Sequence, residues 1–462
     1  MGLGGISVAK GETMVLPSIA IYERYDSNVF NTVSLPGTTS NDFVTGTTPQ
    51  LTVVHLGDRM DAGLVAGGIG EQYINNPGLS YFGGYGGGKF ILDKLVQRFI
   101  PKASLQIAES ASYIPQAPTY STTDLTSGDQ VNPFARGIQI VRTNTFTNAS
   151  FLTGNYALTP TVNLRATYTY SLVRFGHSFA SQPSITGHDT NFQSLVAGPQ
   201  VQVSATDIMG VNFLYQQGDF PGGNIPRYHS YGANAFWNRT WMPEFKTTLF
   251  GGATVVNQGA NNAAAPGSTS TSSTDVAAYN AGFGLNWVDA PGPNPFGALL
   301  PGGGLGGVGP GAGGAAVVGG APGGIGIGGI IAGGARTIAN LNYTGGVFPG
   351  VVSGGGAQVS NVVTASVTRR VTPAFYVQAM GQYARSDSLI TPTSGTSISY
   401  HGYGGNLALQ HMIGRTAFVT LSGSAHSFTG TGVTTGGSTT APLGSQKFDR
   451  YTGILSITML WK

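Results

Sequence analysis

The sequence predicts an all-β fold in which about 18 antiparallel strands (16–18) close into one barrel, and three observations support this prediction. The first is a strict alternation of apolar and polar residues in runs of about ten residues, which turn residues interrupt. In the run 161–172 the even positions are apolar or aromatic and the odd positions are polar, and the run 277–287 repeats the pattern. Each such run forms a strand with one apolar face and one polar face.

The second observation is the composition. Charged residues make up 9% of the 462 residues, against roughly 25% in an ordinary soluble protein. The net charge of +3, with no basic block longer than Arg369-Arg370, excludes a nucleic-acid-binding surface. Cysteine is absent from the sequence, which excludes disulfides and thiolate chemistry. A polar face of Asn, Gln, Thr, Ser and Gly, with no helices to cover the apolar face, indicates a transmembrane barrel whose outer face contacts lipid.

The third observation is the spacing of the strands. The expected strand cores are 14–26, 42–55, 60–72, 80–93, 102–114, 137–155, 161–174, 191–205, 208–217, 228–240, 245–256, 275–288, 335–344, 357–369, 374–386, 397–411, 415–427 and 447–461. Long connections such as 27–41, 114–136, 175–190 and 257–274 alternate with short ones at 56–59, 156–160, 205–207, 241–243 and 413–414. This alternation is typical of outer-membrane barrels, with long extracellular loops, short periplasmic turns and both termini in the periplasm.

We expect residues 1–462 to form one barrel domain with a glycine-rich, low-complexity insert at 289–334, on the periplasmic side. Glycine costs about 1 kcal/mol and proline about 3 kcal/mol per helical position, so a transmembrane helix in the insert is implausible. The insert is either a tolerated flexible expansion or a segment that folds into the lumen or docks a periplasmic partner. The first 14 residues lack the apolar stretch of a signal peptide, so either the numbering begins at a processed start or the chain is not exported.

Three motifs suggest chemistry, and each has a simpler structural interpretation. Residues 83–90 have the spacing of a phosphate-binding loop, but Phe90 replaces the magnesium-binding Ser or Thr, and the stretch lies within an expected strand. The seven histidines show no zinc-site spacing. Ser424 and His426 share one strand face, as a hydrolase pair would, but also as polar lumen residues would. We expect no catalytic residues, no metal and no cofactor.

Alternation assigns candidate pore-lining residues to the polar face, and these are mostly neutral amides: Asn163, Arg165, Gln200, Gln202, Asn234, Asn280, Asn286, Asn340, Gln378, Gln382 and Asn406. Leu164, between two of them, should face lipid. Aromatic residues near strand ends are expected to form two girdles at the membrane interfaces, and they include Tyr22, Tyr25, Phe236-Trp237, Trp241, Phe245, Trp287, Tyr451 and Trp461.

The final strand resembles the signal that the barrel-assembly machinery recognises in outer-membrane proteins. One face carries alternating apolar and aromatic residues, namely Tyr451, Gly453, Leu455, Ile457, Met459 and Trp461. The chain ends with Lys462 rather than with the aromatic residue, and Ser456 stands where a glycine is usual. The alternative is an amphipathic edge strand of a soluble sandwich, in which so many long strands with so little charge are rare.

The first expected strand closes with Tyr25-Asp26-Ser27-Asn28-Val29-Phe30, and later turns read Tyr156-Ala157-Leu158-Thr159-Pro160 and Val371-Thr372-Pro373. With these motifs the chain resembles a family of outer-membrane β-barrel porins that is often associated with exopolysaccharide synthesis and export. The resemblance covers 15–462 in organisation, and its specific motif is six residues long. It implies a location in the outer membrane of a Gram-negative bacterium and periplasmic polysaccharide-export proteins as partners.

The sequence therefore predicts a porin-like channel rather than an enzyme, for export or passage of polysaccharide or other neutral polar solutes. An ion-selective pore would be expected to show rings of charge of one sign, which the candidate positions lack. Two alternatives stay open: an outer-membrane hydrolase or deacylase, and a surface adhesin or scaffold with a closed lumen.

Overall fold

The computed structural model describes residues 11–29, 40–116, 120–121, 137–138, 143–178, 189–221, 227–259, 274–289, 336–349, 357–389, 399–414, 416–431 and 446–461. The elements of the first half are β1 (Thr13–Asp26), β2 (Asp42–Leu56), β3 (Asp61–Tyr73), η1 (Pro77–Leu79), β4 (Tyr81–Ile91), α1 (Asp93–Val96), β5 (Ala103–Gln116), β6 (Tyr120–Ser121), β7 (Gly137–Ile138), β8 (Thr143–Ala157), β9 (Val162–Ser178) and β10 (Thr190–Gln202). The second half contains β11 (Asp207–Asp219), β12 (Tyr228–Met242), β13 (Phe245–Gln258), β14 (Thr274–Val288), β15 (Thr337–Pro349), β16 (Ala357–Thr372), β17 (Phe375–Ser388), β18 (Ser399–Ile413), β19 (Ala417–Thr431) and β20 (Gln446–Leu460).

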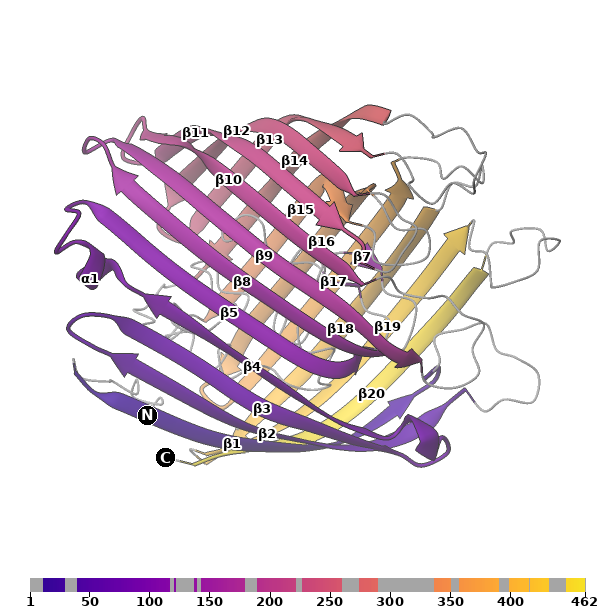
Figure 1. Cartoon of the computed structure of the whole chain (residues 1–462). Helices are drawn as coiled ribbons and strands as arrows, with labels where there is room; N and C mark the ends of the chain where they lie inside the picture. The colour runs from indigo at the N-terminus through magenta and orange to yellow at the C-terminus, as the bar shows by residue number, and fades with distance from the viewer. Residues whose placement is uncertain are drawn as a thin grey trace, which may run out of the picture.

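Eighteen of these strands form one closed antiparallel barrel, which confirms the predicted fold class. Each strand pairs with its neighbours in the chain, except that β5 pairs with β8, because β6 and β7 form a separate two-stranded sheet. The barrel closes where β1 pairs with both β2 and β20, in a register that places Tyr22 opposite Ser456. Figure 1 shows the strands inclined to a common axis and arranged around it.

The short connections share one end of the barrel with the start of β1 and the end of β20, and we name it the turn end; the opposite end is the loop end. At the turn between β2 and β3, Gly57 N donates to Met60 O at 3.0 Å. Between β18 and β19, Gly414 has a φ of +68°, a left-handed conformation that favours glycine. The sequence-predicted turns at these positions are therefore confirmed.

Two elements differ from the sequence prediction. The strand expected over 137–155 begins only at Thr143, and residues 137–138 belong to β7 instead. The connection after β4 contains α1. This helix has only four residues, so it is too short to show a helical period in the sequence. Lys94 holds this helix against the neighbouring turn, since its Nζ donates to Gly57 O at 2.8 Å and to Asp61 Oδ1 at 2.6 Å. No helix within the described ranges combines the length and the apolarity needed to cross a bilayer.

The outer face of the wall is apolar. Along β20 the alternate residues Tyr451, Leu455, Ile457 and Met459, with Trp461 just after the strand, are 45–56% exposed, whereas Ile454 and Ser456 between them are buried. At the turn end, Trp237 Nε1 donates to Asp207 Oδ1 at 2.9 Å, and the Arg239 guanidinium lies 4.1 Å from the Trp241 ring centroid. Aromatic rings that combine apolar area with a polar tip suit a membrane interface.

Two aromatics of the expected girdles face the lumen instead, which corrects that part of the prediction. Tyr22 is 2% exposed and donates to the carboxylate of Glu71, and Phe236 shares the inner face with Ser230. The reason is that side chains alternate between the two faces of a strand. Phe236 and Trp237 are consecutive, and Tyr22 and Tyr25 are three residues apart, so the two members of each pair must lie on opposite faces.

Among the described strands, one acidic residue lies on the outer face near mid-height. Glu109 is exposed at the seventh of the fourteen positions of β5, near mid-height, and faces outward with Ile107 and Tyr113. Its Oε1 accepts a hydrogen bond from Asn148 Nδ2 on the adjacent strand β8. Because an isolated carboxylate in hydrocarbon is costly, this amide offsets part of the cost of the position.

The glycine-rich insert expected over 289–334 lies almost wholly outside the described residues. That it forms a low-complexity segment separate from the barrel wall stays a prediction. Its flanks are described. Asp289 N donates to Thr337 O at 2.8 Å, and Arg336 N donates to Asp289 O at 3.3 Å, at the turn end. The chain therefore leaves β14 and enters β15 at adjacent points, as it would across a tight turn.

Candidate functional site

The inner face of the barrel is the candidate functional site, and strand alternation decides which residues belong to it. Along β9, Leu164 is 41% exposed, whereas Thr167 and Thr169 are 3% and 1% exposed. In a closed barrel the exposed apolar set lies on the outside and the set of opposite parity faces the lumen. Cross-strand register carries this assignment around all 18 strands.

All eleven residues that alternation selects as pore-lining lie on the inner face, on seven strands. They are Asn163 and Arg165 of β9, Gln200 and Gln202 of β10, Asn234 of β12, Asn280 and Asn286 of β14, Asn340 of β15, Gln378 and Gln382 of β17, and Asn406 of β18. Gln202, the last residue of its strand, is exposed at the turn end. That these residues line a conducting path stays a prediction.

Some of these amides form a short hydrogen-bonded ladder. Asn286 Nδ2 donates to Asn340 Oδ1 at 2.6 Å, and Asn340 Nδ2 donates to Ser366 Oγ at 3.4 Å, which links β14, β15 and β16. Two others, Asn234 and Gln382, have a buried side-chain oxygen without a hydrogen-bond partner among the described residues. Rotation of such an amide about its terminal torsion would turn the oxygen toward the lumen, where water or a solute can donate to it.

Alternation alone did not reveal a buried charged cluster near the loop end, on β1 and β3. Arg24 Nη1 and Nη2 donate to Oε1 and Oε2 of Glu71 at 2.9 and 2.8 Å, a bidentate pair. The hydroxyls of Tyr22 and Tyr73 each donate to the same carboxylate at 2.7 Å. Arg24 and Glu71 are 6% and 5% exposed, so both charges are buried and compensated.

A second ion pair closes the barrel at its seam. Arg450 of β20 donates from Nε and Nη2 to the two carboxylate oxygens of Asp26 at 3.0 and 2.5 Å. Asp42, opposite Asp26 on β2, accepts hydrogen bonds from the backbone N–H groups of Ile74, Asn75 and Asn76 at 2.8–3.0 Å. The sequence does indicate which face these residues occupy. Arg24 and Asp26 alternate with the outward-facing Tyr25, so both must lie on the inner face.

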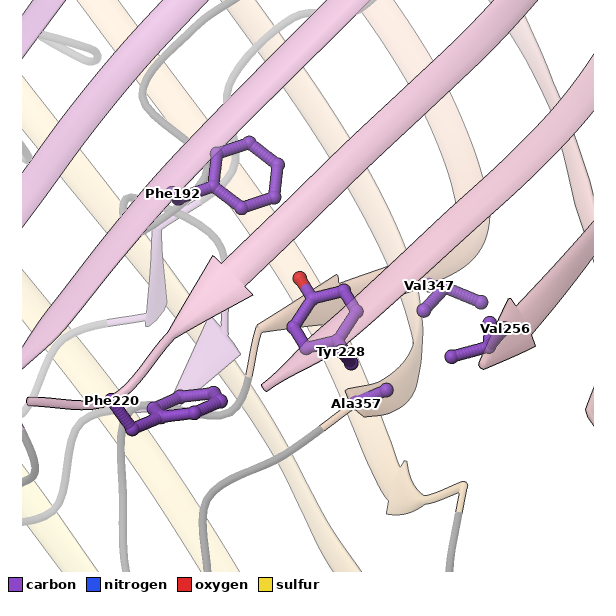
Figure 2. Packing of buried hydrophobic residues seen from close by; sticks show 6 residues of the cluster. All are labelled: Phe192, Phe220, Tyr228, Val256, Val347 and Ala357. Carbon is purple, nitrogen blue, oxygen red and sulfur yellow. The ribbon is translucent and has the colours of Figure 1, made fainter. Parts of the chain in front are cut away.

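An apolar cluster occupies the loop end on the opposite side. Figure 2 shows its six buried members, which come from β10, β12, β13, β15, β16 and the residue after β11: Phe192, Phe220, Tyr228, Val256, Val347 and Ala357. Their exposure is 6% or less, and the rings of Phe220 and Tyr228 lie 6.3 Å apart. Such packing stabilises the rim of the barrel at about 1.5–3 kcal/mol per fully buried large side chain.

The enzymatic motifs form no catalytic arrangement in the described part of the chain. Ser424 Oγ lies 2.6 Å from Thr452 Oγ1, and the ring of His426 lies over Gly404. Within the same ranges, no three His, Asp or Glu side chains are placed to share a metal ion. Residues 83–90 lie inside β4, which confirms the strand interpretation of the glycine-rich motif.

No protein-family model and no curated protein matches the chain. Among solved structures, the chain is similar to the outer membrane protein OpdK of Pseudomonas aeruginosa at 10% identity and a TM-score of 0.43, over 97% of this chain and 99% of that one. OccAB3 of Acinetobacter baumannii matches at 10% identity and a TM-score of 0.40 over the same shares. OprD of Pseudomonas aeruginosa matches at 10% identity and a TM-score of 0.38, over 98% of this chain and 96% of that one. No property of these proteins is carried over to this chain.

Proposed function

We propose that this chain is an outer-membrane channel through which small neutral polar solutes diffuse. The observation that carries the proposal is the pairing of a closed 18-stranded wall with an apolar outer face and a polar inner face. Closure leaves no unpaired strand edge in lipid, and a barrel of about 16–18 strands is wide enough for an aqueous channel. Conduction requires no catalytic group.

The paired charges at the loop end of the inner face favour neutral solutes. The two inner arginines near the loop end, Arg24 and Arg450, are each paired with a carboxylate, so the sector from β20 to β3 presents little net charge. Elsewhere the inner face carries amides, hydroxyls and glycine, together with four basic residues within three positions of the turn end: Lys89, Arg165, Lys246 and Arg370. Strong ion selectivity normally requires a ring of charge of one sign, which basic residues on four of the 18 strands do not complete, whereas amides offer both donors and acceptors to hydroxyl groups.

Export of a polysaccharide is a narrower form of this proposal, and it rests on the family resemblance of residues 25–30. A chain-length series separates the two forms. If neutral oligosaccharides cross liposomes that contain the protein only when they are short, the channel serves small solutes. If permeation continues to long chains at similar rates, the polysaccharide form is favoured.

The test of the channel itself is conductance. The refolded full chain is inserted into a planar lipid bilayer, and single-channel current is recorded in potassium chloride, with heat-unfolded protein as the control. We expect discrete, stable open steps with a weak preference for anions, because the basic residues near the turn end are all of one sign. An inserted barrel that stays silent, with no uptake of small neutral sugars in liposome swelling, contradicts the proposal and favours a closed scaffold.

A further inference from the structure

Two phenylalanines lie side by side on the inner face, close to mid-height. Phe236 of β12 and Phe250 of β13 are direct cross-strand partners. Phe236 is also paired with Gly210 of β11, and Phe250 with Gly282 of β14. One row across four strands therefore reads glycine, phenylalanine, phenylalanine, glycine. We name the two rings the aromatic platform.

The glycines allow both rings to lie along the wall. A Cβ atom at Gly210 would be 2.5 Å from Cζ of Phe236, and one at Gly282 would be 2.5 Å from Cζ of Phe250. Each ring thus occupies the space above the glycine of the neighbouring strand, pointing away from the other ring. Both phenylalanines stay partly exposed, so they present ring surface to the lumen without projecting across it.

Neutral polar side chains flank the aromatic platform. On β12 the next inner-face residues on either side of Phe236 are Asn234 and Asn238, and each has a buried side-chain oxygen with no hydrogen-bond partner among the described residues. Both side chains are partly exposed, and rotation of an amide about its terminal torsion exchanges its oxygen and nitrogen. The corresponding neighbours of Phe250 are Thr248 and Gly252, so the flanking positions on both strands carry no charge.

A pyranose ring matches this surface. Its axial C–H groups form an apolar face that an aromatic ring can cover, and its rim carries hydroxyls that both donate and accept hydrogen bonds. Ligand sites commonly pair apolar and aromatic area with a few placed polar groups, and amides satisfy hydroxyls of either polarity. An inorganic ion would gain little from two aromatic rings and neutral amides, and a purely apolar solute would leave Asn234 and Asn238 unsatisfied.

We propose that the aromatic platform with Asn234 and Asn238 is a saccharide-binding subsite on the channel wall. The proposal rests on the proposed function, because it assumes that solutes reach the lumen. It assigns a class of solute, neutral saccharides with pyranose rings, and a role in which weak binding at mid-height aids passage.

The test is block of channel current by maltohexaose, a neutral linear oligosaccharide, in the refolded full chain. We expect concentration-dependent block in the parent, and an apparent Kd that rises about tenfold in Phe236→Ala and in Phe250→Ala, since each loses one ring contact. Phe236→Trp should retain the block. Phe283→Ala removes an aromatic from the outer face of β14 beside Gly282 and should leave the block unchanged. Open-channel conductance shows that each variant is folded.

Two results would overturn the subsite. One is unchanged block in the Phe236→Ala/Phe250→Ala double variant; the other is equal block by polyethylene glycol of the same mass, which would show obstruction by size alone. If the parent shows no conductance, the channel proposal fails separately. Equilibrium binding of radiolabelled maltohexaose to the detergent-solubilised barrel then tests the subsite, and binding that the double variant retains would overturn it.

Discussion

Leu407→Arg tests directly which face of the wall meets lipid. Leu407 of β18 is 52% exposed on the outer face, and the preceding residue, Asn406, lies on the inner face. Asn406→Arg is therefore a matched control: it places the same charge one residue away on the same strand. If the assignment of faces is right, only Leu407→Arg brings a guanidinium into hydrocarbon.

The expected loss of folding free energy depends on how deep residue 407 lies in the bilayer. Leu407 lies six residues from Ile413 at the turn end of β18. At about 3.4 Å per residue and a tilt of about 40°, six residues climb about 16 Å, close to the middle of an apolar band about 25 Å tall that is centred on the strand. An arginine at that depth costs about 2–4 kcal/mol of folding free energy.

Leu164→Arg serves as a control for depth. Leu164 also faces outward, but it lies two residues from the turn end of β9, about 5 Å along the barrel axis. At the edge of the apolar band the expected cost falls to about 0–1 kcal/mol. Alternation in the sequence gives the face of Leu164 but not this depth.

The measurement is urea unfolding in phospholipid vesicles, followed by tryptophan fluorescence, for the parent and the three variants. We expect Leu407→Arg to lose about 2–4 kcal/mol and both controls to remain within about 1 kcal/mol of the parent. The faces are reversed if Asn406→Arg is the destabilised variant. If all three variants unfold like the parent, the outer face does not meet lipid at β18.

Three further predictions follow from the closing seam, the insert and the charged cluster. Deleting Trp461-Lys462 removes the hydrogen bond from Trp461 N to Pro17 O (3.0 Å), and we expect membrane fractionation to show less assembled barrel; parental levels would contradict this. Deleting 292–332 spares the hydrogen bonds at Asp289, so thermal unfolding should match the parent; higher conductance would indicate an insert that obstructs the lumen, and unchanged conductance and export would indicate a tolerated expansion. Arg24→Ala should cost about 3–5 kcal/mol in urea unfolding because Glu71 loses its counter-ion, and Arg24→Ala/Glu71→Ala should recover part of that loss.

Most of the fold could be predicted from the sequence because a barrel strand repeats every two residues. The expected core at 245–256 matches β13, which spans Phe245–Gln258, and the same alternation separates the inner Asn406 from the outer Leu407. The prediction was wrong where local signals weaken. The first residues of the segment 137–155 alternate as a strand does, yet residues 137–138 pair with β6 rather than with the barrel.

The candidate site was harder to predict because alternation assigns a face but not a partner. Arg24 and Glu71 are 47 residues apart, and only the register of β1 with β2 and of β2 with β3 brings them into contact. The platform was missed for a related reason. Phe236 beside Trp237 looked like part of a girdle, and the glycines that accommodate its ring lie on a neighbouring strand. Cross-strand partners of this kind are not visible in any one stretch of sequence.

The lumen is divided between two surfaces of different chemistry. From β1 to β12 there are nine strand steps in either direction round the barrel, so the charged cluster at Arg24 and the ring of Phe236 lie on opposite walls. The charges on the first wall are paired with one another and buried, which leaves little net charge for an ion that passes the loop end. The second wall offers ring surface beside the amides of Asn234 and Asn238. A solute with an apolar face and a hydroxyl-bearing rim therefore gains contacts at mid-height that an ion does not, and selection at that height should depend on the shape and hydroxyl content of the solute more than on its charge.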